Sequence, residues 1–249
     1  MSLSSYTVVL ITGANQGIGF ECVKKLATEQ PNYRIILCSR DAQKGKEAAA
    51  AVTHFAKNTT VEALELDINN DESIARAAKY VEEKYDRLDA LLNNAGIMST
   101  PGAKSFRDDL RGVMETNAIS AACVTEAFIP LMEKSPHPRI VFMSSNFGSI
   151  TYCLDASRPF YGYDAKPYFT SKAAMNMLGA QYAVQLGNKR GGFKVNMVDP
   201  GFRSTNLNGF HEYGGDPAEG AVEACRLIIS TDEDGPNGTF TSIEGPLPW

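Results

Sequence analysis

Short apolar runs alternate with longer amphipathic segments along almost the whole chain. Runs such as Val8–Ile11 and Ile35–Cys38 carry no alternating polar positions, which is typical of strands buried on both faces of a parallel sheet. The segments between the runs repeat apolar residues at three- and four-residue spacing, as helices do. The pattern predicts strands near 6–11, 33–38, 61–66, 88–92, 138–144, 193–198 and 238–243, and helices near 17–29, 43–57, 71–86, 106–134, 167–187 and 216–229.

This alternation predicts the fold class and the domain organisation. Right-handed crossovers between successive strands produce an α/β fold, a Rossmann-like, doubly wound parallel sheet with helices on both faces. The chain has 249 residues, of which 43% are hydrophobic, and no linker rich in proline, glycine or serine divides it. We therefore expect one domain that spans residues 1–249.

Composition excludes several classes of function. The formal net charge of −5 provides no basic surface for nucleic acid. The first expected strand begins within ten residues, which leaves no room for a targeting peptide, and no apolar stretch is long enough to span a bilayer. The five cysteines and three histidines lack metal-ligand spacing. We expect a cytoplasmic protein with reduced thiols, no metal and no membrane partner.

A glycine-rich segment follows the first expected strand. Residues 12–19 read Thr-Gly-Ala-Asn-Gln-Gly-Ile-Gly, and helical spacing begins directly after them. Bare backbone at such a turn can approach a pyrophosphate, and the helix N-terminus offers unpaired amides to it. The alternative is an ordinary tight turn. The spacing G-x-x-x-G-x-G differs from the G-x-G-x-x-G dinucleotide fingerprint but belongs to a related loop. The candidate cofactor-binding residues here are Gly13, Asn15, Gln16, Gly17, Ile18 and Gly19.

Two further expected strands end in small or hydroxyl-bearing residues. The segment Asn93-Asn94-Ala95-Gly96 follows one strand, and Ser144–Ser145 follows the strand 139–143. Ligands of open α/β sheets bind outside the carboxyl ends of the strands. Asn94, Ala95, Gly96 and Ser145 are therefore placed near a bound ligand.

Tyr168 and Lys172 are separated by about one helical turn, so that both side chains share one helix face. A lysine beside a tyrosine favours the phenolate and lowers the pKa of the phenol toward the range useful for proton transfer. The spacing alone is weak evidence, because Tyr-x-x-x-Lys also occurs by chance. Its weight comes from the glycine loop and the strand-end residues upstream.

Taken together, these residues resemble the short-chain dehydrogenase/reductase family. The resemblance extends from Thr7 to about Gly245 and includes the glycine loop, Asn-Asn-Ala-Gly, Asn117, the Ser-Ser pair and Tyr-x-x-x-Lys. It implies a seven-stranded sheet with the order 3-2-1-4-5-6-7. Within the family the chain is most similar to NADPH-dependent carbonyl reductases.

The resemblance implies catalytic roles for four residues. Tyr168 would donate a proton to the carbonyl oxygen, and Ser145 would hydrogen-bond that oxygen. Lys172 would lower the pKa of the tyrosine and bind the nicotinamide ribose. Asn117, a poor helix former within an expected helix, would hold a water that relays protons from Lys172. An asparagine satisfied in the core is the alternative for this position.

Cofactor selection depends on the end of the second expected strand, which reads Ser39-Arg40 where NAD-binding folds usually carry an acidic residue. A guanidinium suits a 2′-phosphate, so NADP(H) is expected, with help from Asn15. Asp41 is counter-evidence, and a solvated loop arginine is the alternative.

The resemblance also places Asp67 and Ile68 at the adenine. It places Pro200, Gly201 and Thr205 at the nicotinamide, although Asp199 stands where Asn, Ser or Cys is more usual.

The substrate is less well defined than the cofactor. Tyr168 lies 23 positions after Ser145, a longer interval than in many family members. The interval contains Tyr152, Phe160, Tyr161 and Tyr163. These rings suggest a wall for a bulky or aromatic carbonyl, or else a surface loop with a small core of its own. Residues 206–216 would close over the site.

The expected function is reduction of a ketone or aldehyde to an alcohol. The same residues would serve an NADP-linked alcohol dehydrogenase, and a non-catalytic NADP(H) sensor is the alternative from another class. The expected partners are a small carbonyl or alcohol substrate and no nucleic acid. The protein would be a monomer or a homo-oligomer.

Overall fold

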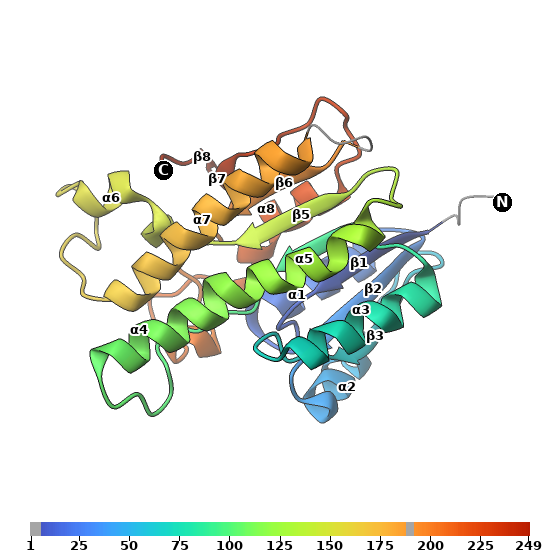
Figure 1. The fold of residues 1–249 in the computed structure, drawn as a ribbon, viewed down its shortest axis with the longest axis horizontal. Coiled ribbons are helices and arrows are strands. Elements are labelled where there is room, and N and C mark those ends of the chain that lie inside the picture. The colour runs from blue at the N-terminus through green and yellow to red at the C-terminus, as the bar shows by residue number, and fades with distance from the viewer. Residues whose placement is uncertain (1–5, 188–191) are drawn as a thin grey trace.

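The computed structural model describes residues 6–187 and 192–249, and it confirms the expected α/β fold (Figure 1). Residues 1–5 and 188–191 of the expected 1–249 domain lie outside the described residues. Every expected strand is present. The strands are β1 (Thr7–Ile11), β2 (Tyr33–Ser39), β3 (Thr60–Glu65), β4 (Ala90–Asn93), β5 (Arg139–Met143), β6 (Lys194–Val198), β7 (Phe240–Ser242) and β8 (Gly245–Pro246).

The strand order is β3-β2-β1-β4-β5-β6-β7-β8, which contains the expected order 3-2-1-4-5-6-7. All neighbouring strands pair in parallel except β8, a two-residue strand antiparallel to β7. The expected count of seven strands was therefore short by one. Gly245, with φ of +122°, lets the chain reverse, and so short a pair carries no hydrophobic pattern that a sequence could reveal.

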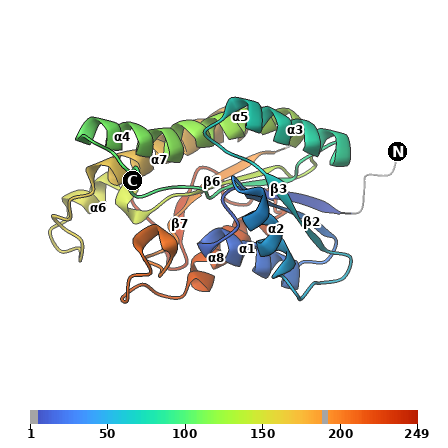
Figure 2. The same ribbon diagram turned by 90° about the horizontal axis from the view of Figure 1, so that it is seen from below.

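The sheet lies between two layers of helices (Figure 2). Helices α3, α4, α5 and α7 cover one face, and α1, α2 and α8 cover the other. A separate buried apolar cluster fills the space on each side of the sheet. The helices are α1 (Gly17–Glu29), α2 (Ala42–Ala50), α3 (Asp71–Tyr85), α4 (Phe106–Met114), α5 (Ser120–Met132), α6 (Ile150–Leu154), α7 (Lys166–Gly187) and α8 (Pro217–Ile229).

Three helical details differ from the expectation. Helix α2 ends at Ala50 rather than near residue 57, because the segment after it is bound to other elements: Ala56 donates to the carbonyl of Ala27 at 2.7 Å. The helix expected over 106–134 is divided by a π-helical turn, Glu115–Ile119. Helix α6 was not expected. Its five residues are too few to show a helical period.

No helix in the described ranges is long and apolar enough to cross a membrane.

Candidate active site

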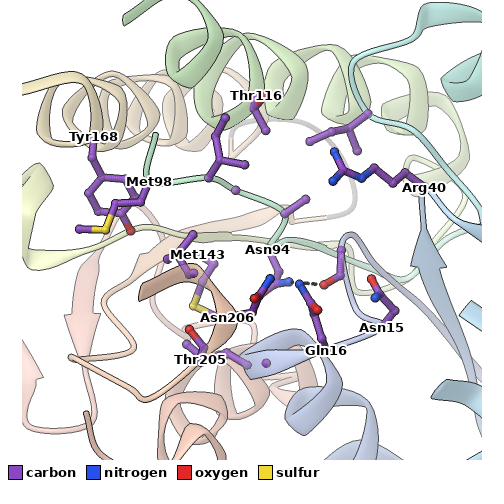
Figure 3. Close-up of a pocket in the computed structure, with 18 of the residues that line it drawn as sticks. Asn15, Gln16, Arg40, Asn94, Met98, Thr116, Met143, Tyr168, Thr205 and Asn206 are labelled. Atoms are coloured by element: carbon purple, nitrogen blue, oxygen red, sulfur yellow. Dashed lines mark hydrogen bonds between the residues drawn. The ribbon is translucent and has the colours of Figure 1, made fainter. Parts of the chain in front are cut away.

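A cavity of about 420 Å³ opens at the carboxyl ends of the strands, where β1 and β4 lie side by side and the chain crosses from one half of the sheet to the other. Asn15 and Arg40 lie at one end of it, and Tyr168 and Met98 lie at the other (Figure 3). The residues expected from the sequence that line it are Gly13, Asn15, Gln16, Gly17, Ile18, Arg40, Asp67, Ile68, Asn94, Ala95, Gly96, Tyr168, Lys172, Pro200 and Thr205.

Five other expected site residues do not line this cavity within the described chain. They are Gly19, Ser39, Asn117, Ser145 and Gly201. Each is adjacent in the sequence to a residue that lines the cavity.

The N-terminus of α1 forms the floor of the cavity at the glycine loop. Its N-cap, Gln16, makes no side-chain capping bond to the described residues, and the first turn carries no acidic side chain. Helices α2, α3, α4 and α8 are all capped by a side chain. Gly17 has φ of +57°, a conformation that side chains disfavour. The first-turn amides of α1 are therefore available to bind an anion.

The glycine loop is held to the end of β4 by Asn94. Its side-chain amide donates to the carbonyls of Thr12 at 2.8 Å and Gly13 at 3.1 Å, while Thr12 Oγ1 accepts from the amides of Asn94 and Ala95. A Cβ on Gly19 would lie 2.4 Å from Asn94 Nδ2. Gly19 therefore permits this junction and does not face the cavity. The candidate list omitted Thr12, although the residue belongs to the motif that revealed the loop.

The second strand ends with its acidic residue engaged elsewhere. Asp41 caps α2 by accepting from the amides of Gln43 and Lys44, both at 3.0 Å. Ser39 is buried, and its hydroxyl accepts from the Asp41 amide at 3.2 Å. Arg40 is exposed and lines the cavity, with no ion-pair or hydrogen-bond partner in residues 6–187 and 192–249. The charge that the end of β2 presents to the cavity is thus the guanidinium.

The loop after β3 brings Asp67 and Ile68 to the same half of the cavity. Asp67 accepts from the backbone amide of Asn69 at 3.0 Å, which orders the turn. Asn69 bonds Thr116 at 3.1 Å and Ser120 at 2.8 Å, so this loop is tied to the π-helical turn. Asn69 and Thr116 also line the cavity. Nothing in the sequence pattern distinguished these two polar residues from ordinary loop and helix positions.

Tyr168 and Lys172 lie on the buried face of α7, as the spacing predicted. Lys172 Nζ donates to the carbonyl of Met143 at 2.7 Å and lies 5.5 Å from the centroid of the Tyr168 ring. Burial lowers the pKa of Lys172 to about 8, and the negative charge of Asp199 opposes that effect. An amine with so low a pKa loses its proton at a lower pH than an ordinary lysine does.

The surroundings of Tyr168 shift the pKa of its phenol. Burial, first, and the charge of Asp199, second, raise the pKa of this phenol, while the Ser145 hydroxyl lowers it. The expected lowering by Lys172 is not among these effects and stays a prediction. Desolvation of the phenolate is the largest effect, and Lys172 loses its own proton at a lower pH than the phenol does.

Ser145 and Asn117 support the pair from opposite sides. Ser145 caps the turn Asn146–Gly148, with its Oγ accepting from the Phe147 amide at 3.2 Å. Asn117 is fully buried in the π-helical turn and bonds both backbone groups of Ile97 at 2.8 Å. Its amide also donates to Ser171 Oγ at 2.9 Å. Asn117 therefore holds the loop after β4 against α7, and π-helical turns are frequent at functional sites.

The loop after β6 forms the remaining wall. Arg203 secures it by donating to the carbonyl of Pro200 at 2.7 Å and by pairing with Glu219 on α8. The segment 206–216 was expected as a cover. Its two ends lie together, because the Ser204 amide donates to the Gly215 carbonyl at 2.9 Å. From it, Asn206 and Leu207 line the cavity, as does Thr205 before it.

Several residues that the sequence did not single out also line the cavity. They are Met98, Ser99 and Pro101, whereas Asn206 and Leu207 belong to the segment 206–216 that was expected to close over the site. The first three follow the Asn-Asn-Ala-Gly segment, whose small residues drew attention to the cofactor only. In Figure 3 the Met98 side chain lies beside the Tyr168 ring.

The four aromatic residues expected as a wall are placed beside the cavity and are not among its lining residues in the described chain. Phe160 and Tyr163 pack around Phe147, with ring centroids 5.3 and 6.1 Å away. Phe147 in turn meets the Tyr168 ring edge-on at 6.4 Å. Tyr152 stacks under Arg158, and Tyr161 is exposed. Part of the segment thus forms an aromatic core that stays partly exposed, and Phe147 connects that core to Tyr168.

No cluster of three or more histidine, cysteine, aspartate or glutamate residues suited to a metal ion occurs in the described parts of the chain.

Comparison with known proteins agrees with this geometry. The family model for the short chain dehydrogenase matches residues 7–212. A short-chain dehydrogenase/reductase of Aspergillus fumigatus is 35% identical, over 94% of this chain and 92% of that protein. Carbonyl reductase [NADPH] 1 of Bos taurus is 28% identical, over 99% of each chain. The structure of NADPH-bound carbonyl reductase from chicken fatty liver matches with a TM-score of 0.79 and 27% identity, over 98% of this chain and 99% of that one. The chain therefore belongs to the short-chain dehydrogenase/reductase family of oxidoreductases, and among its relatives it resembles the carbonyl reductases.

Proposed function

We propose that the protein is an NADPH-dependent carbonyl reductase, which converts a ketone or aldehyde to an alcohol. The observation that carries the proposal is one cavity with two different ends. At one end lie a helix N-terminus and an arginine that have no side-chain partner within the described residues, and at the other lies a buried tyrosine beside a lysine and a serine. Relatives named as NADPH carbonyl reductases, one bovine and one from chicken, support the same reaction.

The residues present fit the cofactor. Gly17 and the free amides of α1 suit its pyrophosphate, and Arg40 with Asn15 suits the 2′-phosphate. Asp67 and Ile68 would hold the adenine, and Thr205 the nicotinamide carboxamide. When bound there, NADPH supplies the hydride. The protein's contribution is to orient the cofactor, exclude water and manage the proton.

The proton is assigned to Tyr168. Its raised pKa keeps the phenol protonated near neutral pH, as a proton donor requires. Ser145 would hydrogen-bond the carbonyl oxygen and stabilise the negative charge that develops on it. Lys172 would bind the nicotinamide ribose. A water relay through Asn117 stays a prediction, since the Asn117 side chain already bonds Ile97 and Ser171.

The substrate proposed is a bulky or ring-bearing carbonyl compound. Met98, Pro101 and Leu207 supply apolar surface to the cavity wall, with Met98 beside Tyr168, and the Phe147 ring meets the ring of that tyrosine edge-on. By microscopic reversibility the same groups catalyse oxidation of the alcohol, so the direction depends on cofactor supply rather than on these residues.

The test is a screen of NADPH consumption over quinones, aromatic ketones, diketones and aliphatic aldehydes, with NADH as the matched control. We expect turnover with NADPH on at least one ring-bearing carbonyl and much weaker turnover with NADH. Equal use of NADH would contradict the cofactor assignment. NADPH binding without turnover on any class would favour the sensor alternative.

A further inference from the structure

Asp199 is a buried carboxylate beside the catalytic centre for which the mechanism above has no use. It directly follows β6, and its exposed fraction is 7%. An isolated buried carboxylate is costly, so a residue of this kind needs compensating partners.

The register of the sheet places Asp199 on the catalytic side. Side chains alternate along a strand, and in β6 Met197 joins the apolar cluster under α7 whereas Val198 joins the cluster on the opposite face. Asp199 therefore returns to the α7 side. Val198 pairs with Met143 across the sheet, so Ser144 stands opposite Asp199. Lys172 Nζ bonds the Met143 carbonyl, one residue before that point.

The carboxylate connects two segments of the site. Asp199 accepts from the Gly201 amide at 3.1 Å, within the loop that leads to Thr205. The backbone amide of Asn146, the residue after Ser145, also stabilises its ionised form. The Asp199 amide is anchored to Thr241 of β7 at 2.8 Å. A single side chain thus joins the backbone that carries Ser145 to the backbone that begins the nicotinamide loop.

The titratable groups around Asp199 come from three directions. Tyr168 and Lys172 on α7 both experience its negative charge. Arg203, in the loop that follows, favours ionisation of Asp199, while Glu244 in the turn between β7 and β8 opposes it. The end of β5 presents serine hydroxyls and the Asn146 amide, which are uncharged. Burial is the largest effect and raises the pKa of Asp199 above its usual range.

We propose that Asp199 is a positioning residue of the active site, whose carboxylate holds the Ser145 segment against the nicotinamide loop, residues 199–205, and sets a negative charge beside Tyr168 and Lys172. The charge would act on the pH range of the reaction, and the hydrogen bonds on its geometry. The effect proposed on turnover rests on the proposed reductase function. The effect proposed on the pKa of Lys172 does not.

The sign of the effect follows from the charge. A nearby anion stabilises protonated lysine and destabilises the phenolate, so it raises both pKa values. Replacing Asp199 by asparagine removes the charge and keeps an acceptor for the Gly201 amide. Lys172 and Tyr168 should then lose their protons at lower pH.

The first measurement titrates Lys172 by the NMR signal of its ¹³C-labelled ε-carbon, identified by its absence in Lys172→Met. In Asp199→Asn and Asp199→Ser we expect the midpoint to fall by about half a pH unit or more. Glu244→Gln is the matched control, because it removes an exposed carboxylate from the same neighbourhood. We expect it to leave the midpoint near the parental value.

The second measurement is the pH dependence of kcat/KM for carbonyl reduction. The alkaline decline should begin at lower pH in Asp199→Asn by a similar amount, since the tyrosine must be protonated to donate. Asp199→Ala, which removes acceptor and charge together, should also lower kcat at the optimum. A purely structural role would lower activity without moving either pH midpoint.

The proposal is overturned if the titration midpoint of Lys172 in folded Asp199→Asn or Asp199→Ser equals that of the parent protein. If no carbonyl compound is reduced, the NMR titration still decides it: a lowered midpoint supports the role of Asp199 while the reductase function alone fails.

Discussion

The two ends of the cavity are built in different ways. The cofactor end consists of strand-to-helix turns, where Gly17, Asn94 and the α1 amides are set by the sheet itself. The substrate end consists of segments outside the sheet, namely 97–101 and 206–214, and the insertion 150–163 packs near it through Phe147. The first is fixed by hydrogen bonds between strand ends, whereas the second depends on side chains of loops packed against one another.

This difference separates recognition of a shared cofactor from recognition of a particular substrate. Backbone amides and a helix terminus bind phosphate in any sequence that preserves the turn. The surface that a wall of loops presents to a substrate changes with every side chain that is substituted in those loops. Tyr168 belongs to both ends, since its helix packs on the sheet and its ring touches the aromatic core of the insertion through Phe147. Substitutions should therefore affect the two ends separately, except at this tyrosine.

The largest effect is expected from Tyr168→Phe. Proton donation by a positioned group contributes ~10²–10⁴-fold, so turnover should fall at least about a hundredfold while NADPH binding and folding persist. Turnover and NADPH fluorescence are measured together. Tyr182→Phe is the control on the same helix, because its hydroxyl bonds Glu126 at 2.9 Å, away from the site. Near-parental turnover in Tyr168→Phe would rule out this proton donor.

Arg40→Ala should affect the cofactor end alone. Loss of charge-assisted bonds to a 2′-phosphate costs about 1.5–3 kcal/mol, which is roughly 10–150-fold in the Kd for NADPH. The Kd for NADH should scarcely change. Arg76→Ala, on the exposed face of α3, is the control for net charge. Parallel weakening of both cofactors would mean that Arg40 does not select between them.

Met98→Ala should affect the substrate end alone. Removing most of a side chain that lines the wall beside Tyr168 should raise KM for a ring-bearing carbonyl about tenfold, or ~1.4 kcal/mol, with NADPH affinity unchanged. Met177→Ala, at an exposed methionine of α7, is the control. A rise of the same size for a two-carbon aldehyde would show that Met98 shapes the site rather than contacts the larger substrate.

The smallest effect is expected from Phe160→Ala. Its ring packs on Phe147 and Phe202 but does not line the cavity. An aromatic pair contributes ~0.5–1.5 kcal/mol, so KM for bulky carbonyls should rise by about 2–10-fold through a loosened Phe147. The neighbouring, exposed Tyr161→Ala should have no effect. An unchanged KM in Phe160→Ala would show that the insertion supports the fold and does not shape the substrate site.

The sequence by itself determined the strands of the sheet and the glycine turn after the first of them, and its family resemblance implied the strand order. Apolar strand runs and glycine spacing are local patterns, and the parallel sheet brings the residues that follow each strand to one edge. It did not reveal β8 or the break of the helix 106–134 at Asn117, because a two-residue strand and a π-helical turn have no period of their own.

Only the tertiary structure decided the rest. Met98, Leu207 and Asn69 line the cavity because loops distant in sequence converge there, and no local signal records that convergence. The pKa of Tyr168 was likewise decided by burial and by Asp199, which opposed what the spacing to Lys172 implied. Desolvation and charge at a point depend on everything packed around it, so they become defined only when the chain is folded.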